Sequence, residues 1–218
     1  MSARDLLRSN DVRFHALAVG FGTDEWSQPS LCDGWSNHDV LAHLVSGYSA
    51  GAVTVTAEML RHRGSFDPAN AAMARALAAS HTPADLLAEY STLIDRPRGL
   101  GRYFPRRLLL GDHVTHELDI VFALDRAPSI PPDALIAVLN TQVAVANPFV
   151  PAFFNSRGVR LVATDADWTH GDGPVVEGRA ADLVSVLGNR PKMLPRLGGQ
   201  GADVLAMRIS RRPSRRAG

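Results

Sequence analysis

The sequence contains a single cysteine, Cys32, and a single lysine, Lys192, among 218 residues. One cysteine cannot form an intramolecular disulfide, and a chain of this length buries about 70% of its unfolded surface without one. Its 23 basic and 22 acidic residues nearly cancel, so no broad electrostatic field attracts nucleic acid. No apolar run approaches the roughly 20 residues that span a bilayer, and the charged first twenty residues lack the apolar core of a signal peptide. We therefore expect a cytoplasmic protein that binds neither nucleic acid nor a membrane.

Apolar residues follow a helical period through most of residues 1–127. Four principal helices are expected, over 3–19, 37–62, 83–97 and 106–124. A shorter, alanine-rich helix is expected over 67–80. Ser36 with Asp39, and Thr82 with Asp85, are typical of helix starts, because the hydroxyl accepts from a free backbone N–H and the carboxylate suits the positive helix end. Four long helices joined by loops favour an antiparallel bundle.

Residues 128–212 combine helix and strand patterns. The expected elements are a bridging helix over 132–146, strands at 159–164 and 175–176, a helix over 180–187 and a closing strand over 203–210. Alternation of β-branched residues favours the strands, and the segment THGDGP between them is typical of a turn. We therefore predict an α+β fold in which a four-helix bundle precedes a small α+β domain. Residues 213–218 are expected to form a disordered basic tail.

Three polar residues in the helical part are candidates for a metal site. His43 lies within the otherwise apolar segment VLAHLVSGY. Asp112 and His116 are four residues apart, so their side chains project from the same face of a helix. Two imidazoles and one carboxylate from two facing helices match a divalent metal with an open position, zinc first, with iron or nickel as alternatives. The pattern also fits a buried ion pair between Asp112 and His116 with a hydrogen-bonded core His43.

The helix that carries Asp112 offers further candidates. His113 and Glu117 form a second pair with the same spacing, rotated by about 100° from the first. The segment HVTHE lacks the H-E-x-x-H arrangement, and this face needs a third ligand of its own. Asp119 either orients the ring of His116 as a hydrogen-bond acceptor or is an ordinary exposed carboxylate.

Other chemistries find little support in the residues. The sequence has no G-x-S-x-G motif, Walker-type loop or Rossmann fingerprint. Cys32 precedes a helix start, as a nucleophile could, but a buried and unreactive thiol is the better interpretation. The residues alone thus leave the metal site and the core ion pair as open alternatives.

Three segments, taken together and in order, resemble one family. They are WSQPSLCDGWSNHDVLAHLVSGY (26–48), RLLLGDHVTHELDI (107–120) and GVRLVATDADWTHGDGPVVEGRAADLVSVLGNRP (158–191). This arrangement is similar to that of the mycothiol-dependent maleylpyruvate isomerase family, which has a DinB-like four-helix metal-binding domain and a small carboxy-terminal domain. The resemblance covers most of the chain and favours the metal site over the ion pair.

The resemblance implies a set of ligands and a reaction. It implies His43, Asp112 and His116 as metal ligands, although the family usually has glutamate at the position of Asp112. The shorter aspartate leaves the identity of the metal open. Members use the low-molecular-weight thiol mycothiol at a divalent metal, usually zinc, to isomerise maleylpyruvate or to transfer the thiol. A free thiol has a pKa near about 8.5, and a divalent cation removes its proton.

In an isomerase, the resulting thiolate adds to a conjugated double bond, allows rotation and leaves. In a transferase, it stays attached to its electrophile. The family also implies a catalytic arginine in the second domain that binds the substrate carboxylates. Arg208 is the candidate, with Arg106, Arg107 and Arg160 as alternatives. Two competing hypotheses are a non-catalytic metal- or small-ligand-binding protein of the same fold and a metal-free bundle with a buried hydrogen-bond network.

Overall fold

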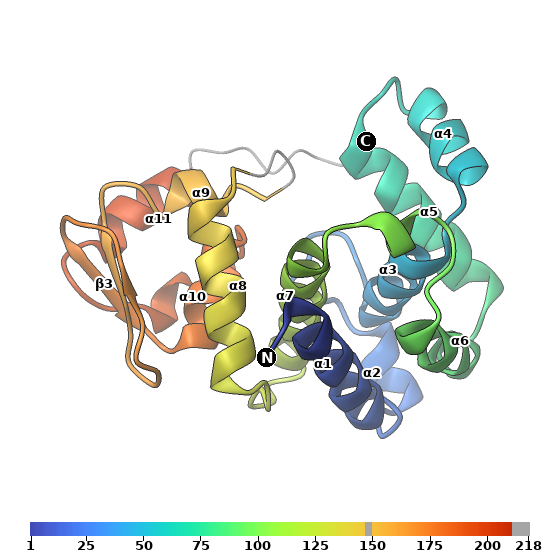
Figure 1. The fold of residues 1–218 in the computed structure, drawn as a ribbon, viewed down its shortest axis with the longest axis horizontal. Helices are drawn as coiled ribbons and strands as arrows, with labels where there is room; N and C mark the ends of the chain where they lie inside the picture. The colour runs from blue at the N-terminus through green and yellow to red at the C-terminus, as the bar shows by residue number, and fades with distance from the viewer. Residues whose placement is uncertain (147–149, 211–218) are drawn as a thin grey trace.

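Figure 1 shows the computed structural model of the chain, which describes residues 1–146 and 150–210. The N-terminal part is built on four long helices, α1 (Ala3–Ala18), α3 (Asn37–Ser49), α6 (Pro83–Asp95) and α7 (Arg106–Ala123). Helices α1 and α3 each contact both α6 and α7, so the four enclose a common core. The predicted four-helix bundle is therefore confirmed. The tail expected at 213–218 lies outside the described residues.

Helix α3 shows how the sequence specifies these helices. The Ser36 side chain accepts a hydrogen bond from the Asp39 backbone N–H, and the Asp39 carboxylate accepts from the Ser36 backbone N–H. This reciprocal pair satisfies two backbone donors at the helix start. Val40, Leu41 and Leu44 then follow on the buried face. Shorter elements complete this part of the chain: α2 (Thr23–Ser27), α4 (Ala52–Arg61), α5 (Phe66–Ser80) and the 3₁₀ turn η1 (Leu100–Tyr103).

The helix expected over 37–62 is interrupted after Ser49, and this part of the prediction is wrong. Ala50 is extended, with φ −61° and ψ 124°, and Gly51 precedes the first residue of α4. The Ala50 carbonyl accepts a hydrogen bond from the Leu100 N–H at 2.9 Å, so η1 takes the place of the next helical turn. Because this partner comes from 50 residues further along the chain, apolar periodicity could not locate the break.

Gly101 marks the point where η1 passes directly over α3. A Cβ atom at this position would lie 2.0 Å from the Gly47 carbonyl oxygen. We expect Gly101→Ala to lower the free energy of unfolding by about 1–3 kcal/mol, because overpacking forces backbone to move. Urea denaturation measures this change. Gly47→Ala is the control, since its added methyl group meets nothing within 4 Å and should stabilise the helix by roughly 0.5–1 kcal/mol. A Gly101→Ala protein as stable as the wild type would contradict the close contact.

The C-terminal part packs against α7 through α8 and α10. Its elements are α8 (Pro132–Ala144), α9 (Ala152–Asn155), β1 (Arg160–Ala163), β2 (Thr169–His170), β3 (Val175–Gly178), α10 (Ala180–Leu187), the 3₁₀ turn η2 (Pro191–Arg196) and α11 (Ala202–Ser210). The strand order is β2-β1-β3, with β1 antiparallel to β2 and parallel to β3. This small sheet beside helices confirms the predicted α+β class.

The closing strand predicted over 203–210 is wrong, because these residues form helix α11. Leu205 and Ile209, four residues apart, are both buried, which gives α11 one apolar face at the helical period. A segment this short fits either period, so its alternation could not decide between strand and helix. The segment expected to be a turn also begins with strand β2.

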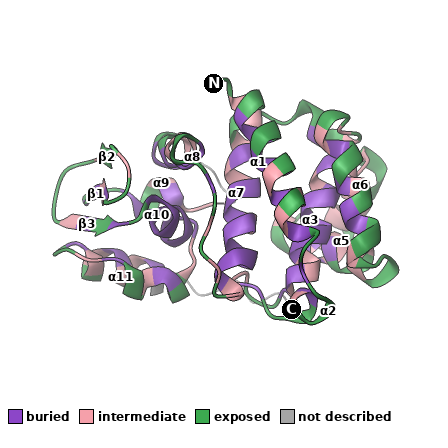
Figure 2. Cartoon of the chain, turned by 90° about the horizontal axis from the view of Figure 1, so that it is seen from below, coloured by how far each residue is buried: buried purple, intermediate pink, exposed green. Residues whose placement is uncertain are grey.

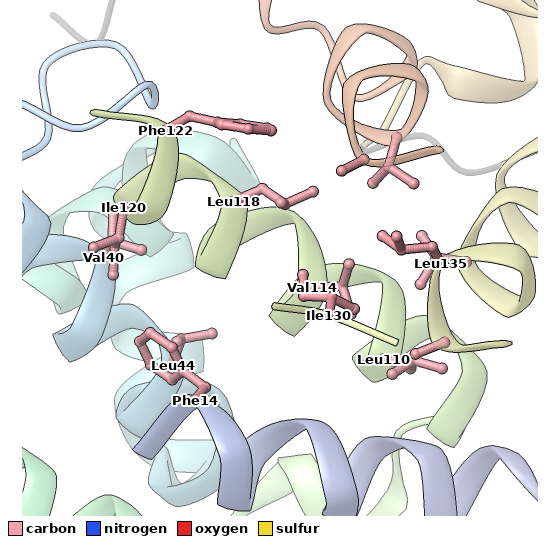
Figure 3. Close-up of a cluster of buried hydrophobic side chains, with 14 of the residues drawn as sticks. Phe14, Val40, Leu44, Leu110, Val114, Leu118, Ile120, Phe122, Ile130 and Leu135 are labelled. Atoms are coloured by element: carbon pink, nitrogen blue, oxygen red, sulfur yellow. The ribbon is translucent and has the colours of Figure 1, made fainter. Parts of the chain in front are cut away.

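Helix α7 is the bundle helix that also contacts the C-terminal part, and Figure 2 shows it buried along most of its length. On one side, Ile120 lies beside Val40 of α3 (Figure 3). On the other side, α7 contacts α8, and Val114 belongs to the same buried cluster as Ile130 and Leu135 of α8 (Figure 3). Both surfaces of this helix therefore belong to the core. Within the described ranges, no helix has the length and apolar character needed to cross a membrane.

Candidate metal centre

The three sequence-predicted metal ligands meet between α3 and α7. The Nε2 atom of His43, in the middle of α3, lies 3.2 Å from Oδ2 of Asp112. The Nε2 atom of His116, one turn after Asp112 on α7, lies 3.5 Å from Oδ1 of the same carboxylate. The two imidazole centroids are 4.5 Å apart. Each imidazole thus points its Nε2 atom toward the Asp112 carboxylate.

These separations suit a divalent cation. The ligand atoms of His43, Asp112 and His116 all lie within 4.8 Å of one another. Zinc binds imidazole nitrogen and carboxylate oxygen at about 2.0–2.2 Å, so two tetrahedral ligands lie roughly 3.4 Å apart. The nitrogen–oxygen separations of 3.2 and 3.5 Å fit this spacing. The aspartate side chain, although shorter than glutamate, reaches both histidines. The three residues therefore fit a metal that keeps a further position for another ligand.

The second nitrogen of each imidazole has a partner outside the cluster. Nδ1 of His43 lies 3.2 Å from Oδ1 of Asn70 on α5. Nδ1 of His116 lies 3.0 Å from Oδ2 of Asp119, which confirms Asp119 as the hydrogen-bond acceptor for this ring. An oxygen acceptor at Nδ1 favours the tautomer with its proton on that atom, which leaves Nε2 as the metal-binding atom. Both histidines are therefore oriented for coordination through Nε2.

Asp119 is completely buried and pairs with Arg190, the residue just before η2. The Nε and Nη2 atoms of Arg190 donate to Oδ1 and Oδ2 of Asp119 at 2.8 and 2.5 Å. Burial acts to raise the pKa of Asp119, but Arg190 and His116 outweigh it and lower this pKa to about 2. The carboxylate is therefore ionised at neutral pH.

In the absence of a cation, the Asp112 carboxylate interacts favourably with the two imidazoles. Burial acts to raise the pKa of Asp112, but the neighbouring His43 and His116 outweigh it and hold this pKa well below its usual range. Burial acts in the opposite direction on His116, where Asp112 and Asp119 raise the pKa to about 9. A cation that binds here therefore competes with a proton on His116, because metal-binding imidazole is neutral.

Trp35, from the loop before α3, packs against both imidazoles. Its ring is stacked with that of His116, with an interplanar angle of 7° and centroids 6.1 Å apart. Its edge contact with His43 has centroids 5.4 Å apart. Trp35 is itself buried, so it covers this side of the cluster with an apolar surface.

The second pair on α7, His113 and Glu117, has partners in the core of the bundle. Nδ1 of His113 lies 2.8 Å from Oδ1 of Asp11, whose other oxygen accepts from the Tyr48 hydroxyl. Glu117 accepts two hydrogen bonds of 2.6 Å from Arg13. Among the described residues, neither member of this pair belongs to a set of ligating atoms close enough to share an ion. The pair therefore joins α1 to α7.

A second set of ligating atoms overlaps the first. Cys32, His116 and Asp119 also place one ligating atom each within 4.8 Å of the others. Asp119 is already bound by Arg190, however, and burial raises the pKa of Cys32 to about 12. The half-buried thiol therefore keeps its proton at neutral pH, in agreement with its interpretation as unreactive.

Arg208 lies on α11, and its guanidinium donates to the backbone carbonyls of Asn155 and Arg157. Among the alternatives, Arg106 donates to the Arg102 carbonyl. The substrate-binding role assigned to Arg208 stays a prediction.

Two residues beside the cluster, Asn70 and Arg190, have no local pattern that would have marked them in the sequence. Asn70 lies in the alanine-rich α5, and its role depends on the packing of α5 against α3. Arg190 follows α10 by three residues and is 71 positions away from Asp119. Only the tertiary structure connects either residue with the histidines.

Comparisons with known proteins agree with this arrangement. Residues 7–100 match a family model described as the mycothiol maleylpyruvate isomerase N-terminal domain. Two similar solved structures are the crystal structure of the mycothiol-dependent maleylpyruvate isomerase and that of a histidine-to-alanine mutant. Each covers 92% of both chains, with a TM-score of 0.54 and 14% sequence identity, which shows a shared fold. No curated protein sequence matches the chain.

The fold and the cluster thus define a helical-bundle protein with a candidate metal centre and a small C-terminal sheet. Residues 7–100 match the model of the mycothiol maleylpyruvate isomerase N-terminal domain, which confirms the resemblance inferred from the sequence for that segment. His43 lies within the matched residues, whereas Asp112 and His116 follow them on α7.

Proposed function

We propose that this chain is a divalent-metal-dependent enzyme, with zinc as the expected metal, that uses mycothiol to isomerise maleylpyruvate. The observation that carries the proposal is the convergence of His43, Asp112 and His116 at separations that suit zinc. The family of residues 7–100, and the likeness of the whole chain to a structure named as a mycothiol-dependent maleylpyruvate isomerase, support this thiol and this reaction.

A bound divalent cation supplies one chemical property, the acidity that converts a thiol into a thiolate at neutral pH. The chain's own residues prepare the position for it. His43 and His116 present Nε2, while Asn70 and Asp119 hold their Nδ1 atoms. Trp35 keeps water away from one side of the rings. A low-molecular-weight thiol stays reduced in the cytoplasm, which supports the expected location.

The expected division of the chain into residues 1–127 and 128–212 is part of the proposal. The metal ligands then all come from the first unit, and the second unit supplies Arg190. A substrate with carboxylate groups needs a cationic partner, and Arg208 stays our candidate for it.

The test is conversion of maleylpyruvate to fumarylpyruvate by the zinc-loaded protein, with and without mycothiol. We expect turnover only with mycothiol, and its loss in His116→Ala. An adduct of the thiol with the substrate would identify a transferase instead, because both reactions start from the same thiolate. Zinc binding without turnover of any electrophile would identify a non-catalytic binding protein. Equal rates for the wild type and His116→Ala would contradict a role for this site.

A further inference from the structure

We propose that Arg190 is a positioning residue, through which the C-terminal part of the chain holds the metal ligand His116 in place. The inference rests on the proposed metal site and concerns what orients its ligands. Arg190 acts on the candidate ligands through Asp119. The continuous path runs from the guanidinium of Arg190 to both oxygens of Asp119, and from Oδ2 of Asp119 to Nδ1 of His116.

The geometry of the Arg190–Asp119 pair fixes the direction of the carboxylate. Two parallel N–H···O bonds of 2.8 and 2.5 Å hold both oxygens in one plane, which a single point charge cannot do. The Asp119 side chain is 0% exposed and that of Arg190 is 14% exposed, so water screens the pair only weakly. The oxygen that accepts from His116 therefore has one defined position.

Arg190 also supplies hydrogen bonds that the buried Asp119 carboxylate needs. Oδ1 of Asp119 accepts from Nε of Arg190, and Oδ2 accepts from Nη2 of Arg190 while it lies 3.0 Å from Nδ1 of His116. A buried carboxylate that loses such donors pays a desolvation cost, so we expect it to turn toward other donors. The hydrogen bond that holds Nδ1 of His116 would then be lost, and the ring would no longer have one fixed orientation.

Arg190 is itself fixed by the end of α10. Its Nη1 atom donates to the Gly188 carbonyl at 2.5 Å, and its backbone N–H donates to the Ser185 carbonyl. A Cβ atom at Gly188 would lie 3.4 Å from the Thr115 side chain of α7, so the end of α10 lies against the helix that carries His116. The packing of α10 against α7 therefore fixes Arg190 and, through Asp119, the orientation of the His116 ring.

The test compares zinc dissociation constants of the purified full-length wild type, Arg190→Gln and Arg190→Lys, measured by competition with a chromogenic chelator. Loss of the direct hydrogen-bonding partner of a ligand, here Asp119, typically weakens metal binding about 10–100-fold. Arg190→Gln frees that partner without removing it, so we expect a loss near about 10-fold, the lower end of this range. Arg190→Lys keeps the charge but not the two-point contact, so it should recover part of the affinity. Because lysine keeps a cation beside the buried Asp119, this variant should also be less destabilised than Arg190→Gln.

The matched control is Arg196→Gln. Arg196 is the last residue of η2, the turn that Arg190 precedes, and its Nη1 atom lies 3.6 Å from Oδ1 of Asp182, a carboxylate outside the metal cluster. This variant should keep the wild-type zinc affinity. The visible spectrum of the cobalt-loaded proteins gives a second readout, because it reports ligand geometry and should change in Arg190→Gln but not in Arg196→Gln.

Three results would overturn the inference in different ways. Equal zinc affinities and equal cobalt spectra for the wild type and both Arg190 variants would overturn the role of Arg190 and leave the proposed metal site intact. Equal weakening by Arg190→Gln and Arg196→Gln would show a general effect on stability instead of positioning. A wild type that binds no zinc would overturn the proposed site and, with it, this inference.

Discussion

His43→Ala is expected to weaken zinc binding more than about 100-fold, because it removes a direct ligand, and even outer partners contribute about 10–100-fold. The variant leaves Asp112 and His116 as two ligands on one helix, which is one fewer than zinc enzymes use. Elemental analysis of the purified protein, followed by competition with a chelator, measures the loss. Thiol-dependent turnover should disappear with the metal.

The control for this experiment is His62→Ala. Glu58 and His62 repeat the spacing of Asp112 and His116 at the C-terminal end of α4, with 3.8 Å between Oε2 of Glu58 and Nε2 of His62. Among the described residues, no third ligating side chain lies near enough to complete a site there. His62→Ala should therefore retain its zinc. If His43→Ala keeps as much zinc as His62→Ala, the cluster is not the metal centre.

The second large effect is expected at Arg13, which binds the buried Glu117. The Glu117 side chain is 0% exposed, and both of its oxygens accept from Arg13 at 2.6 Å. Arg13→Met leaves this carboxylate without its cationic partner, and breaking a buried pair in this way costs about 3–5 kcal/mol of stability. Urea denaturation of the variant and the wild type measures the difference.

The loss of stability in Arg13→Met should depend on pH. Burial already raises the pKa of Glu117, despite the opposing effect of Arg13, and removing Arg13 raises this pKa further. An acid whose pKa is higher in the folded state than in the unfolded state favours folding only while it is protonated. The destabilisation in Arg13→Met should therefore be smaller near about pH 5 than near about pH 8.

The double variant Arg13→Met with Glu117→Leu is the control, since it removes both charges and should recover much of the stability. A loss in Arg13→Met that is below about 1 kcal/mol, or that is the same at both pH values, would show that the pair contributes as little as an exposed one.

The sequence was informative where local patterns determine structure. Capping residues and apolar periodicity located the main helices, since both act within a few residues along the chain. The pairing of Asp112 with His116 followed from their spacing, and His43 was a candidate because it lies in an apolar segment. The family resemblance then favoured the metal site over a core ion pair. The hydrogen bond from His116 to Asp119 could also be anticipated, because three residues along a helix bring two side chains together.

The remaining features depend on partners from distant segments. The break at Ala50 becomes stable through the N–H of Leu100, and the helical state of 203–210 depends on a buried face for Leu205. Arg190 illustrates the same limit at the site, because its partner is 71 positions away. No local pattern encodes such contacts.

The burial of both faces of α7 has a consequence for the order of events during synthesis. When the ribosome has released only the first 127 residues, the apolar stripe that includes Val114 has nothing to cover it. Asp119 also lacks Arg190 at that stage. The nascent bundle should therefore expose apolar surface and have a low affinity for metal until α8 and α10 have emerged. We expect maturation with zinc to be a late step, after translation of the C-terminal segment.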